Sequence, residues 1–234
     1  MAMKQGRIAL VTGTGGELGA AIAARLSDDG LDVIGLDLRG PSSGGPRRNY
    51  SCDLTDIAAL SDTLEQIRRE AGPIGVLVNN AGYYSAQSFW ELQAEQVQRT
   101  FAVNVTAVIH ACQQVARQMM ETGGGVIVNV ASVAGRIGSS QIDYGASKAA
   151  VINLTLSLGR VLAEHNIRIN AVAPGVIDSG MGNYIPPHIK ERHLAMTPLK
   201  RAARPDEIAN VVAFLASDAA SYMTGTTVEI TGGT

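Results

Sequence analysis

Tyr144 and Lys148 stand four residues apart in the stretch SVAGRIGSSQIDYGASK. If this segment is helical, both side chains lie on one face of the helix. An ammonium group close to a phenol favours the phenolate, so the spacing predicts a pKa for Tyr144 below the usual value of about 10. Such a tyrosine can serve as a general acid or base. An ordinary amphipathic helix accounts for the same spacing, and the pair alone favours that alternative.

Two further polar residues support the chemical interpretation. Ser132 lies at the end of a predicted buried strand, and Asn104 lies within FAVNV in the long predicted helix before that strand. Both are expected to converge with Tyr144 at the same end of the sheet. Asn104, Ser132, Tyr144 and Lys148 are therefore the candidate catalytic residues.

A second candidate site is the glycine-rich stretch VTGTGGELG, which precedes a helical pattern and follows an apolar run. A strand, a glycine turn and a helix in this order direct helix N-terminal amides at a pyrophosphate. Asp37 ends the second predicted strand, eighteen residues after Gly19. A carboxylate there accepts both ribose hydroxyls of an adenosine and repels a 2′-phosphate. The pattern predicts NAD as the cofactor, with NADP less favoured.

Two alternatives stay open around Asp37. Its carboxylate can simply cap a loop, and the neighbouring Arg39, Arg47 and Arg48 are compatible with NADP. A second acid, Asp53, ends the third predicted strand and is a candidate contact for the adenine edge.

The elements that must position these residues alternate between apolar strands and helices. The predicted strands are Ile8–Val11, Val33–Leu36, Val76–Val78, Val126–Val130, Ile167–Val172 and Val228–Ile230. The predicted helices are Leu18–Asp28, Ile57–Glu70, Gln93–Met120, Tyr144–Glu164 and Pro205–Leu215. Continuous apolar strands are typical of a parallel sheet covered on both faces. The alternation predicts an α/β, doubly wound Rossmann sheet of about seven mostly parallel strands, with its ligand beyond the strands' carboxyl ends.

We expect one domain over residues 1–234, because no linker or internal repeat is present. Two segments interrupt the alternation. Gly40 to Arg48 is expected to be a surface loop, and Gly175 to Lys200 a long excursion with short helices that forms a substrate lid.

Composition excludes several classes of function. The 234 residues carry a formal net charge of -2 with interspersed signs, so neither nucleic acid nor a membrane surface is an expected partner. Cys52 and Cys112 lie sixty positions apart without clustered histidines, so neither a metal site nor a disulfide is indicated. No apolar run approaches the ~18–20 residues that span a bilayer. A cytoplasmic location is expected.

The ordered set of motifs resembles the short-chain dehydrogenase/reductase family over nearly the whole chain. The motifs are TGTGGELG, NNAG at Asn79–Gly82, Asn104, Ser132, YGASK at Tyr144–Lys148, PGVIDS at Pro174–Ser179, RPDEIANVVAFLASD at Arg204–Asp218 and TGTTVEITGG at Thr224–Gly233. The resemblance implies an NAD(P)-dependent oxidoreductase that interconverts a secondary alcohol and a ketone.

The resemblance also implies a role for each candidate catalytic residue. Tyr144 would exchange a proton with the carbonyl or alcohol oxygen, and Lys148 would lower the pKa of Tyr144 and hold the nicotinamide ribose. Ser132 would hydrogen-bond the reacting oxygen, and Asn104 would position a water molecule that relays the proton. The candidate cofactor-binding residues are Gly13, Gly15, Gly16, Glu17, Leu18, Gly19, Asp37, Asp53, Leu54, Asn80, Ala81, Gly82, Tyr144, Lys148, Pro174, Gly175, Ile177 and Ser179.

Glu17 is the main departure from the family's pattern, because it stands where the middle glycine of the turn is expected. A carboxylate ~5 Å from a phosphate would cost about 3 kcal/mol at an effective dielectric constant of 20. Thr14 and Glu17 have the spacing of a capping box, which would explain the acid structurally. The alternative function is therefore a non-catalytic dinucleotide-fold binding or regulatory protein, weakened at the phosphate turn.

The resemblance leaves the substrate open among 3-oxoacyl thioesters, hydroxysteroids and dihydrodiols. The pocket is expected between Tyr83–Ser85, Gly138–Asp143 and the segment with Met181, Tyr184 and Ile185, and its apolar and aromatic side chains suit a hydrophobic ketone. An acyl-carrier partner would need a basic patch, for which the candidates are Lys190, Arg192, Lys200, Arg201 and Arg204. Family members usually pair their long helices between subunits, so a homotetramer is expected.

Overall fold

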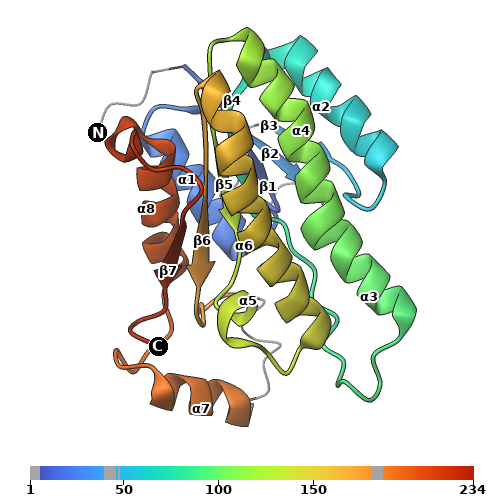
Figure 1. Cartoon of the computed structure of the whole chain (residues 1–234), viewed down its shortest axis with the longest axis vertical. Coiled ribbons are helices and arrows are strands. Elements are labelled where there is room, and N and C mark those ends of the chain that lie inside the picture. The colour runs from blue at the N-terminus through green and yellow to red at the C-terminus, as the bar shows by residue number, and fades with distance from the viewer. Residues whose placement is uncertain (1–5, 40–45, 47, 181–186) are drawn as a thin grey trace.

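Within the part of the chain that the structure describes, seven strands form one sheet in which every pairing is parallel (Figure 1). The computed structural model describes residues 6–39, 46, 48–180 and 187–234. The strands are β1 (Ile8–Thr12), β2 (Asp32–Asp37), β3 (Arg48–Ser51), β4 (Ile74–Asn79), β5 (Gly125–Val130), β6 (Ile167–Pro174) and β7 (Thr227–Ile230). Their order is β3-β2-β1-β4-β5-β6-β7. This arrangement confirms the predicted doubly wound fold.

Side chains of the continuous apolar strands belong to two separate hydrophobic clusters, one on each face of the sheet. Ala9 and Val11 of β1 pack with α1 (Glu17–Asp28) and α8 (Pro205–Ala216). Ile8 and Leu10, whose side chains alternate with these, pack with α2 (Ile57–Ala71) and α4 (Ala107–Glu121). Both faces of β1 are therefore buried, which explains why its sequence is a continuous apolar run and does not alternate with polar residues.

The long helix predicted over Gln93–Met120 contains an irregular turn. It comprises α3 (Ala94–Phe101), a π-helical turn η1 (Ala102–Thr106) and then α4. Asn104 lies within the π-helical turn and is buried. Single π turns inside α-helices are frequent at functional sites.

The other helical elements of the described chain follow β5, β6 and α8 in the sequence. They are α5 (Ala134–Ile137), α6 (Ile142–Leu162), the 3-10 turn η2 (Ala163–His165), α7 (Pro187–Met196) and the 3-10 turn η4 (Asp218–Ala220). Helix α7 belongs to the predicted lid, whereas Met181, Tyr184 and Ile185 lie outside the described residues. No helix of the described chain is long and apolar enough to cross a membrane.

One boundary expected from the sequence is wrong. The composition predicts a loop that includes Arg48, but Arg48 starts β3 because it pairs with Ile34 at the edge of the sheet. Most of that predicted loop, residues 40–45 and 47, lies outside the described residues. The carboxyl ends of the parallel strands all point toward the end of the sheet where α5 and α7 lie (Figure 1).

Candidate active site

The glycine turn lies between the end of β1 and the start of α1, as its motif predicts. Gly13 has a φ of +76°, and a Cβ there would lie 2.8 Å from the Cα of Ala81. A Cβ on Gly19 would collide with the carbonyl oxygen of Gly13. Both positions therefore require glycine for conformation or close approach, so this turn is built as the predicted phosphate turn would be.

Thr12, the last residue of β1, ties the turn to the segment after β4 and was not singled out from the sequence. The Thr12 hydroxyl accepts the main-chain N–H groups of Asn80 and Ala81, each at 3.0 Å. The Asn80 side chain donates to the carbonyl oxygens of Thr12, at 2.9 Å, and Gly13, at 3.3 Å. Asn80 thus holds the turn with its side chain. The position of Thr12, directly before the first glycine, was the signal for this role.

The Asp37 carboxylate lies directly against the glycine turn. It accepts the N–H groups of Gly15 at 2.8 Å and Arg39 at 2.9 Å. A Cβ on Gly15 would lie 2.9 Å from the Asp37 carboxyl carbon, so the glycine makes room for the acid. The guanidinium of Arg48 forms an ion pair with Asp32 at the other end of β2. Asp37 therefore lies against the glycine turn, where its role as a ribose acceptor stays a prediction, and Arg48 is paired with Asp32.

The segment after β3 contributes Asp53 and Leu54. One Asp53 oxygen accepts both the N–H and the hydroxyl of Thr55, at 2.9 and 2.8 Å. These hydrogen bonds hold the pKa of Asp53 below its usual value. Leu54 and Ala81 line the same small cavity, together with Thr12, Asn79, Val103, Ala107, Val108 and Ala111.

Lys148 and Tyr144 share a face of α6, as their spacing predicts. The Lys148 Nζ lies 5.6 Å from the centroid of the Tyr144 ring. The same nitrogen donates to the carbonyl oxygen of Val130, at the end of β5, at 2.8 Å. Burial of the ammonium group lowers the pKa of Lys148 to about 8.

The expectation that the pKa of Tyr144 is lowered is wrong in this arrangement. Burial raises its pKa, and the hydrogen bond with Ser132 opposes this only in part. The Tyr84 ring packs edge-on against Tyr144 with centroids 5.8 Å apart. The phenolate would thus be desolvated, and desolvation outweighs the stabilisation that the four-residue spacing suggested.

Asn104 joins the loop after β4 to α6. Its side-chain oxygen accepts the N–H of Tyr83 at 2.7 Å, and its side-chain nitrogen donates to the Tyr83 carbonyl and to the Ser147 hydroxyl, each at 2.9 Å. Ser147 in turn donates to the carbonyl oxygen of Tyr144 at 2.8 Å. Asn104 is therefore connected to Tyr144, and Ser147 is a linking residue that the sequence analysis missed.

Ser132 and the segment Pro174–Ser179 occupy neighbouring strand ends. Ser132 follows β5 and accepts the N–H of Ala134 at 3.2 Å. Pro174 ends β6, and the N–H of Gly175 donates to Ile230 of β7 at 2.9 Å. Ile177 forms an isolated bridge with Ala203, and Ser179 is buried. The candidate residues that follow β5 and β6 thus lie at the carboxyl ends of these two neighbouring strands.

The capping box expected for Glu17 is not formed. The residue that caps α1 is Gly16, Glu17 is the first residue of the helix, and no side chain caps it. The buried Thr14 hydroxyl instead donates to the Asn49 side chain at 2.7 Å, so it is directed toward β3. The exposed Glu17 carboxylate accepts the N–H of Gly180 at 3.0 Å.

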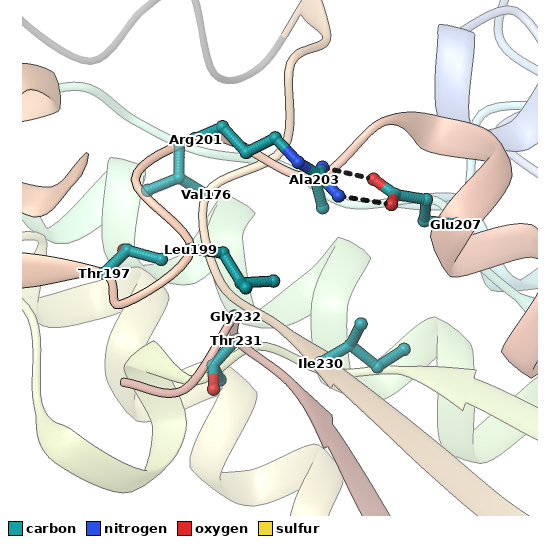
Figure 2. A pocket seen from close by; sticks show the side chains of 9 residues that line it. All are labelled: Val176, Thr197, Leu199, Arg201, Ala203, Glu207, Ile230, Thr231 and Gly232. Atoms are coloured by element: carbon teal, nitrogen blue, oxygen red, sulfur yellow. Dashed lines mark hydrogen bonds and ion pairs between the residues drawn. The ribbon is translucent and has the colours of Figure 1, made fainter.

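A small cavity lies beside the segment after β6 (Figure 2). Its volume is about 80 Å³, and its lining comprises Val176, Thr197, Leu199, Arg201, Ala203, Glu207, Ile230, Thr231 and Gly232. Arg201 makes two hydrogen bonds of 2.7 Å to Glu207 at its rim. The polar groups at this rim therefore satisfy one another.

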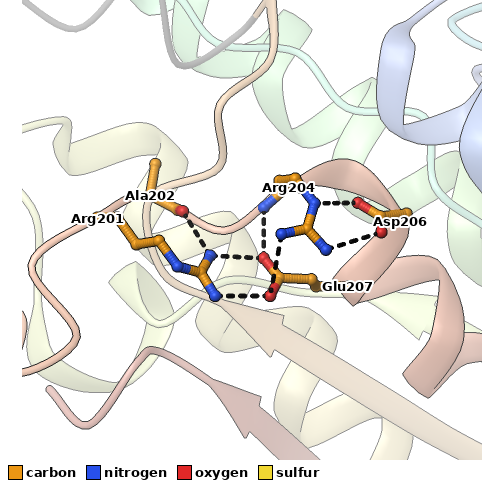
Figure 3. A network of polar contacts seen from close by, with 5 residues as sticks. All are labelled: Arg201, Ala202, Arg204, Asp206 and Glu207. Atoms are coloured by element: carbon orange, nitrogen blue, oxygen red, sulfur yellow. Dashed lines mark hydrogen bonds and ion pairs between the residues drawn. The ribbon is translucent and has the colours of Figure 1, made fainter.

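Two of the cations considered for a docking patch, Arg201 and Arg204, are paired with carboxylates (Figure 3). Arg204 makes two hydrogen bonds of 3.0 Å to Asp206, next to the Arg201–Glu207 pair. Lys190 lies 3.7 Å from Asp178. Three of the five candidate cations, Lys190, Arg201 and Arg204, thus lie against carboxylates of the same chain, while Lys200 donates to the carbonyl oxygen of Ala195.

Comparisons with known proteins agree with this geometry. A family model described as enoyl-(acyl carrier protein) reductase matches residues 15–234. The 3-oxoacyl-[acyl-carrier-protein] reductase of Escherichia coli (strain K12) is 36% identical over 237 residues, covering 98% of this chain and 97% of that protein. The 3alpha-hydroxysteroid dehydrogenase of Mediterraneibacter gnavus is 43% identical over 180 residues, covering 76% and 72%. A crystal structure of NAD+-bound xylitol dehydrogenase has a TM-score of 0.90 at 33% identity, covering 98% and 99%.

The chain belongs to the short-chain dehydrogenase/reductase family. It is an NAD(P)-dependent oxidoreductase that acts on CH–OH or C=O groups of small molecules. The predicted family and enzyme class are confirmed, and the alternative of a non-catalytic protein is not supported.

Proposed function

We propose that the enzyme interconverts a secondary alcohol and a ketone, with NAD as its preferred cofactor and Tyr144 as general acid and base. The arrangement of Lys148 and Tyr144 supports this proposal most directly. The Lys148 Nζ lies 5.6 Å from the centroid of the Tyr144 ring and donates a hydrogen bond to the carbonyl oxygen of Val130. The bound cofactor supplies or accepts the hydride. Every proton in the reaction is then handled by side chains of this chain and by water.

In the reducing direction Tyr144 donates its phenolic proton to the carbonyl oxygen. Its raised pKa keeps it protonated at neutral pH, as a general acid requires. Ser132, which hydrogen-bonds Tyr144, stabilises the negative charge that develops on the reacting oxygen. In the oxidising direction Tyr144 first releases its proton to water, and the resulting phenolate accepts the proton of the alcohol while the same two groups hold the oxygen.

Lys148 and Asn104 support this proton transfer. The Lys148 ammonium group has three N–H donors, and one of them donates to the carbonyl oxygen of Val130. The others remain for the nicotinamide ribose and for water, which would return the proton to Tyr144. Asn104 connects the Tyr83 loop to Ser147 of α6 through hydrogen bonds. We propose that it also orders this water.

Asp37 supports the preference for NAD. Its carboxylate lies at the end of β2 against Gly15, where it can accept the ribose hydroxyls and repel a 2′-phosphate. The remaining cofactor-binding residues that we propose are Gly13, Gly15, Gly16, Glu17, Leu18 and Gly19 at the phosphates; Asp53, Leu54, Asn80, Ala81 and Gly82 at the adenosine; and Pro174, Gly175, Ile177 and Ser179 at the nicotinamide.

We favour as substrate a small alcohol that carries further hydroxyl groups and is not attached to a carrier protein. Three buried polar atoms beside the expected pocket have no hydrogen-bond partner among the described residues: the Ser85 hydroxyl, the Gln141 side-chain oxygen and one Asp143 oxygen. Buried polar groups generally find partners, and substrate hydroxyls would supply them. The paired arginines of Figure 3 favour a free substrate over one carried by an acidic protein. This revises the expectation of a hydrophobic ketone.

We infer a homotetramer built through α4 and α6. These helices expose Ile109, Met120, Leu156 and Val161, each between 46% and 58% accessible. Exposed apolar side chains on neighbouring long helices are typical of subunit interfaces. A cytoplasmic location stays a prediction from the sequence.

A paired screen tests the proposed function. NADH and NADPH are each tested with polyols and their ketoses, 3-oxoacyl thioesters and 3-oxosteroids, in both directions. We expect the highest kcat/KM with NAD(H) and a polyol or another small hydroxylated alcohol. Higher activity with NADPH and a protein-bound 3-oxoacyl thioester would refute both the cofactor and the substrate assignments.

A further inference from the structure

Glu17 connects two segments that lie far apart in the sequence. Its carboxylate accepts the N–H of Gly180 at 3.0 Å, across 163 positions. Glu17 is the first residue of α1, beside the glycine turn, and Gly180 ends the described part of the segment after β6. The bond therefore joins the proposed phosphate end of the cofactor site to the proposed nicotinamide end.

The segment after β6 is also anchored on the side that precedes Ser179. The N–H of Asp178 donates to Ala203 at 2.8 Å, and the N–H of Ala203 donates to Val176 at 2.9 Å. Ser179 is only 8% exposed, and its N–H is turned back to Ile177 at 3.0 Å. Among the described contacts, the Glu17 bond is the one that holds the main chain immediately beyond Ser179.

We propose that Glu17 is a positioning residue that fixes Gly180 and thereby Ser179, which contacts the nicotinamide in the proposed function. This inference rests on that function for the role of Ser179. The hydrogen bond needs only the acceptor oxygen of Glu17, whereas the negative charge of the carboxylate opposes phosphate binding at the same helix N-terminus. The residue thus has a positioning effect and an opposite electrostatic effect.

Two substitutions separate these effects. Glu17→Gln keeps an acceptor oxygen and removes the charge, so NADH is expected to bind about three- to tenfold more tightly, with a smaller loss of kcat than Glu17→Ala causes. Glu17→Ala removes both, so NADH is expected to bind more tightly while kcat falls at least about fivefold, because a misplaced contact slows the chemical step. Glu164→Ala, at an exposed site in the 3-10 turn η2, serves as the control.

Hydrogen exchange without cofactor provides a second readout. The amide of Gly180 is protected by the bond to Glu17 in the wild type and should remain protected in Glu17→Gln. In Glu17→Ala its exchange should accelerate at least about tenfold, with no change in the strands. The measurement is made by NMR or by mass spectrometry of the peptide that contains residues 176–180.

The outcomes overturn or support the inference separately from the proposed function. Unchanged Gly180 exchange in Glu17→Ala refutes the positioning role, as does an equal loss of kcat in Glu17→Gln and Glu17→Ala. If the wild type does not bind NADH, the proposed function fails, and the exchange experiment still decides whether Glu17 holds Gly180.

Discussion

The Lys148 ammonium lies 5.6 Å from the centre of the Tyr144 ring and is held there by the carbonyl of Val130 at the end of β5. Lys148 is only 4% exposed, so the fold keeps a cationic side chain where water cannot solvate it fully. A charge buried in this way reduces stability unless it is compensated. The arrangement therefore indicates a residue retained for chemistry.

Replacing Tyr144 by phenylalanine should remove the proton donor while preserving the ring packing against Tyr84. We expect kcat to fall about 10²–10⁴-fold with the affinity for NADH within about twofold of wild type. Steady-state kinetics and a fluorescence titration of NADH measure the two quantities. Retention of more than a tenth of the activity would show that another group transfers the proton.

The buried Lys148 should also make stability depend on pH. Its pKa is about 8 in the folded protein, against 10.5 for an ordinary lysine in water. Between pH 8 and 10 the unfolded chain binds a proton that the folded protein has released, so the free energy of unfolding should rise with pH by up to about 3 kcal/mol. Above this range the raised pKa of Tyr144 acts in the opposite direction.

Lys148→Met is the matched variant for this effect. It should lack the rise between pH 8 and 10 and should be more stable than the wild type near pH 7, while losing catalytic activity. Urea denaturation at several pH values provides the measurement. Parallel pH profiles for the two proteins would contradict the assignment of the lowered pKa to Lys148.

Asp37→Ser should weaken discrimination against NADP. Loss of the carboxylate removes repulsion of the 2′-phosphate, so the ratio of kcat/KM for NAD over NADP should fall about tenfold to a hundredfold. Asp32→Asn, at the other end of β2, is the control and should leave the ratio unchanged. A ratio unaffected by Asp37→Ser would mean that Asp37 only caps the turn.

Asn104→Ala should leave the N–H and carbonyl of Tyr83 without their partner. Each unsatisfied buried group costs about 1–3 kcal/mol, so the loss of both partners should lower the free energy of unfolding by about 2–6 kcal/mol. Ser147→Ala removes the bond between Asn104 and Ser147 but leaves both Tyr83 bonds in place, so it should cost less. Denaturant titration of both variants measures the difference, and equal losses would argue against Asn104 as the centre of this network.

A charge placed on the proposed helix interface should break the oligomer. Leu156→Glu and Val161→Glu each introduce a carboxylate among the exposed apolar side chains of α6. Light scattering coupled to size exclusion should show a tetramer for the wild type and dimers or monomers for the variants. A tetrameric mass in both variants would place the interface elsewhere.

The sheet and most helix positions were predictable because continuous apolar strands and helical periodicity carry local information. Arg48 was not predictable as a strand residue because its strand lies at the edge and pairs through β2 without an apolar pattern. The capping box failed for a long-range reason, since Thr14 is bonded to Asn49 across 35 positions.

The chemistry of Tyr144 was only partly predictable. The four-residue spacing places Lys148 beside it, but spacing says nothing about how far the surrounding chain removes water. Desolvation depends on neighbours such as Tyr84, which reaches the site from the loop after β4. The bond from Glu17 to Gly180 was equally hidden, because each partner looks unremarkable in its own segment.

The π-helical turn at Ala102–Thr106 makes the active site sensitive to chain length as well as to residue type. A π turn holds one more residue than an α turn, and each α-helical residue advances about 100° around the axis. Deleting one residue here would leave a regular helix but rotate Asn104 relative to α4, separating it from Tyr83 or Ser147. A single-residue deletion could therefore silence the enzyme while every catalytic side chain remains in the sequence.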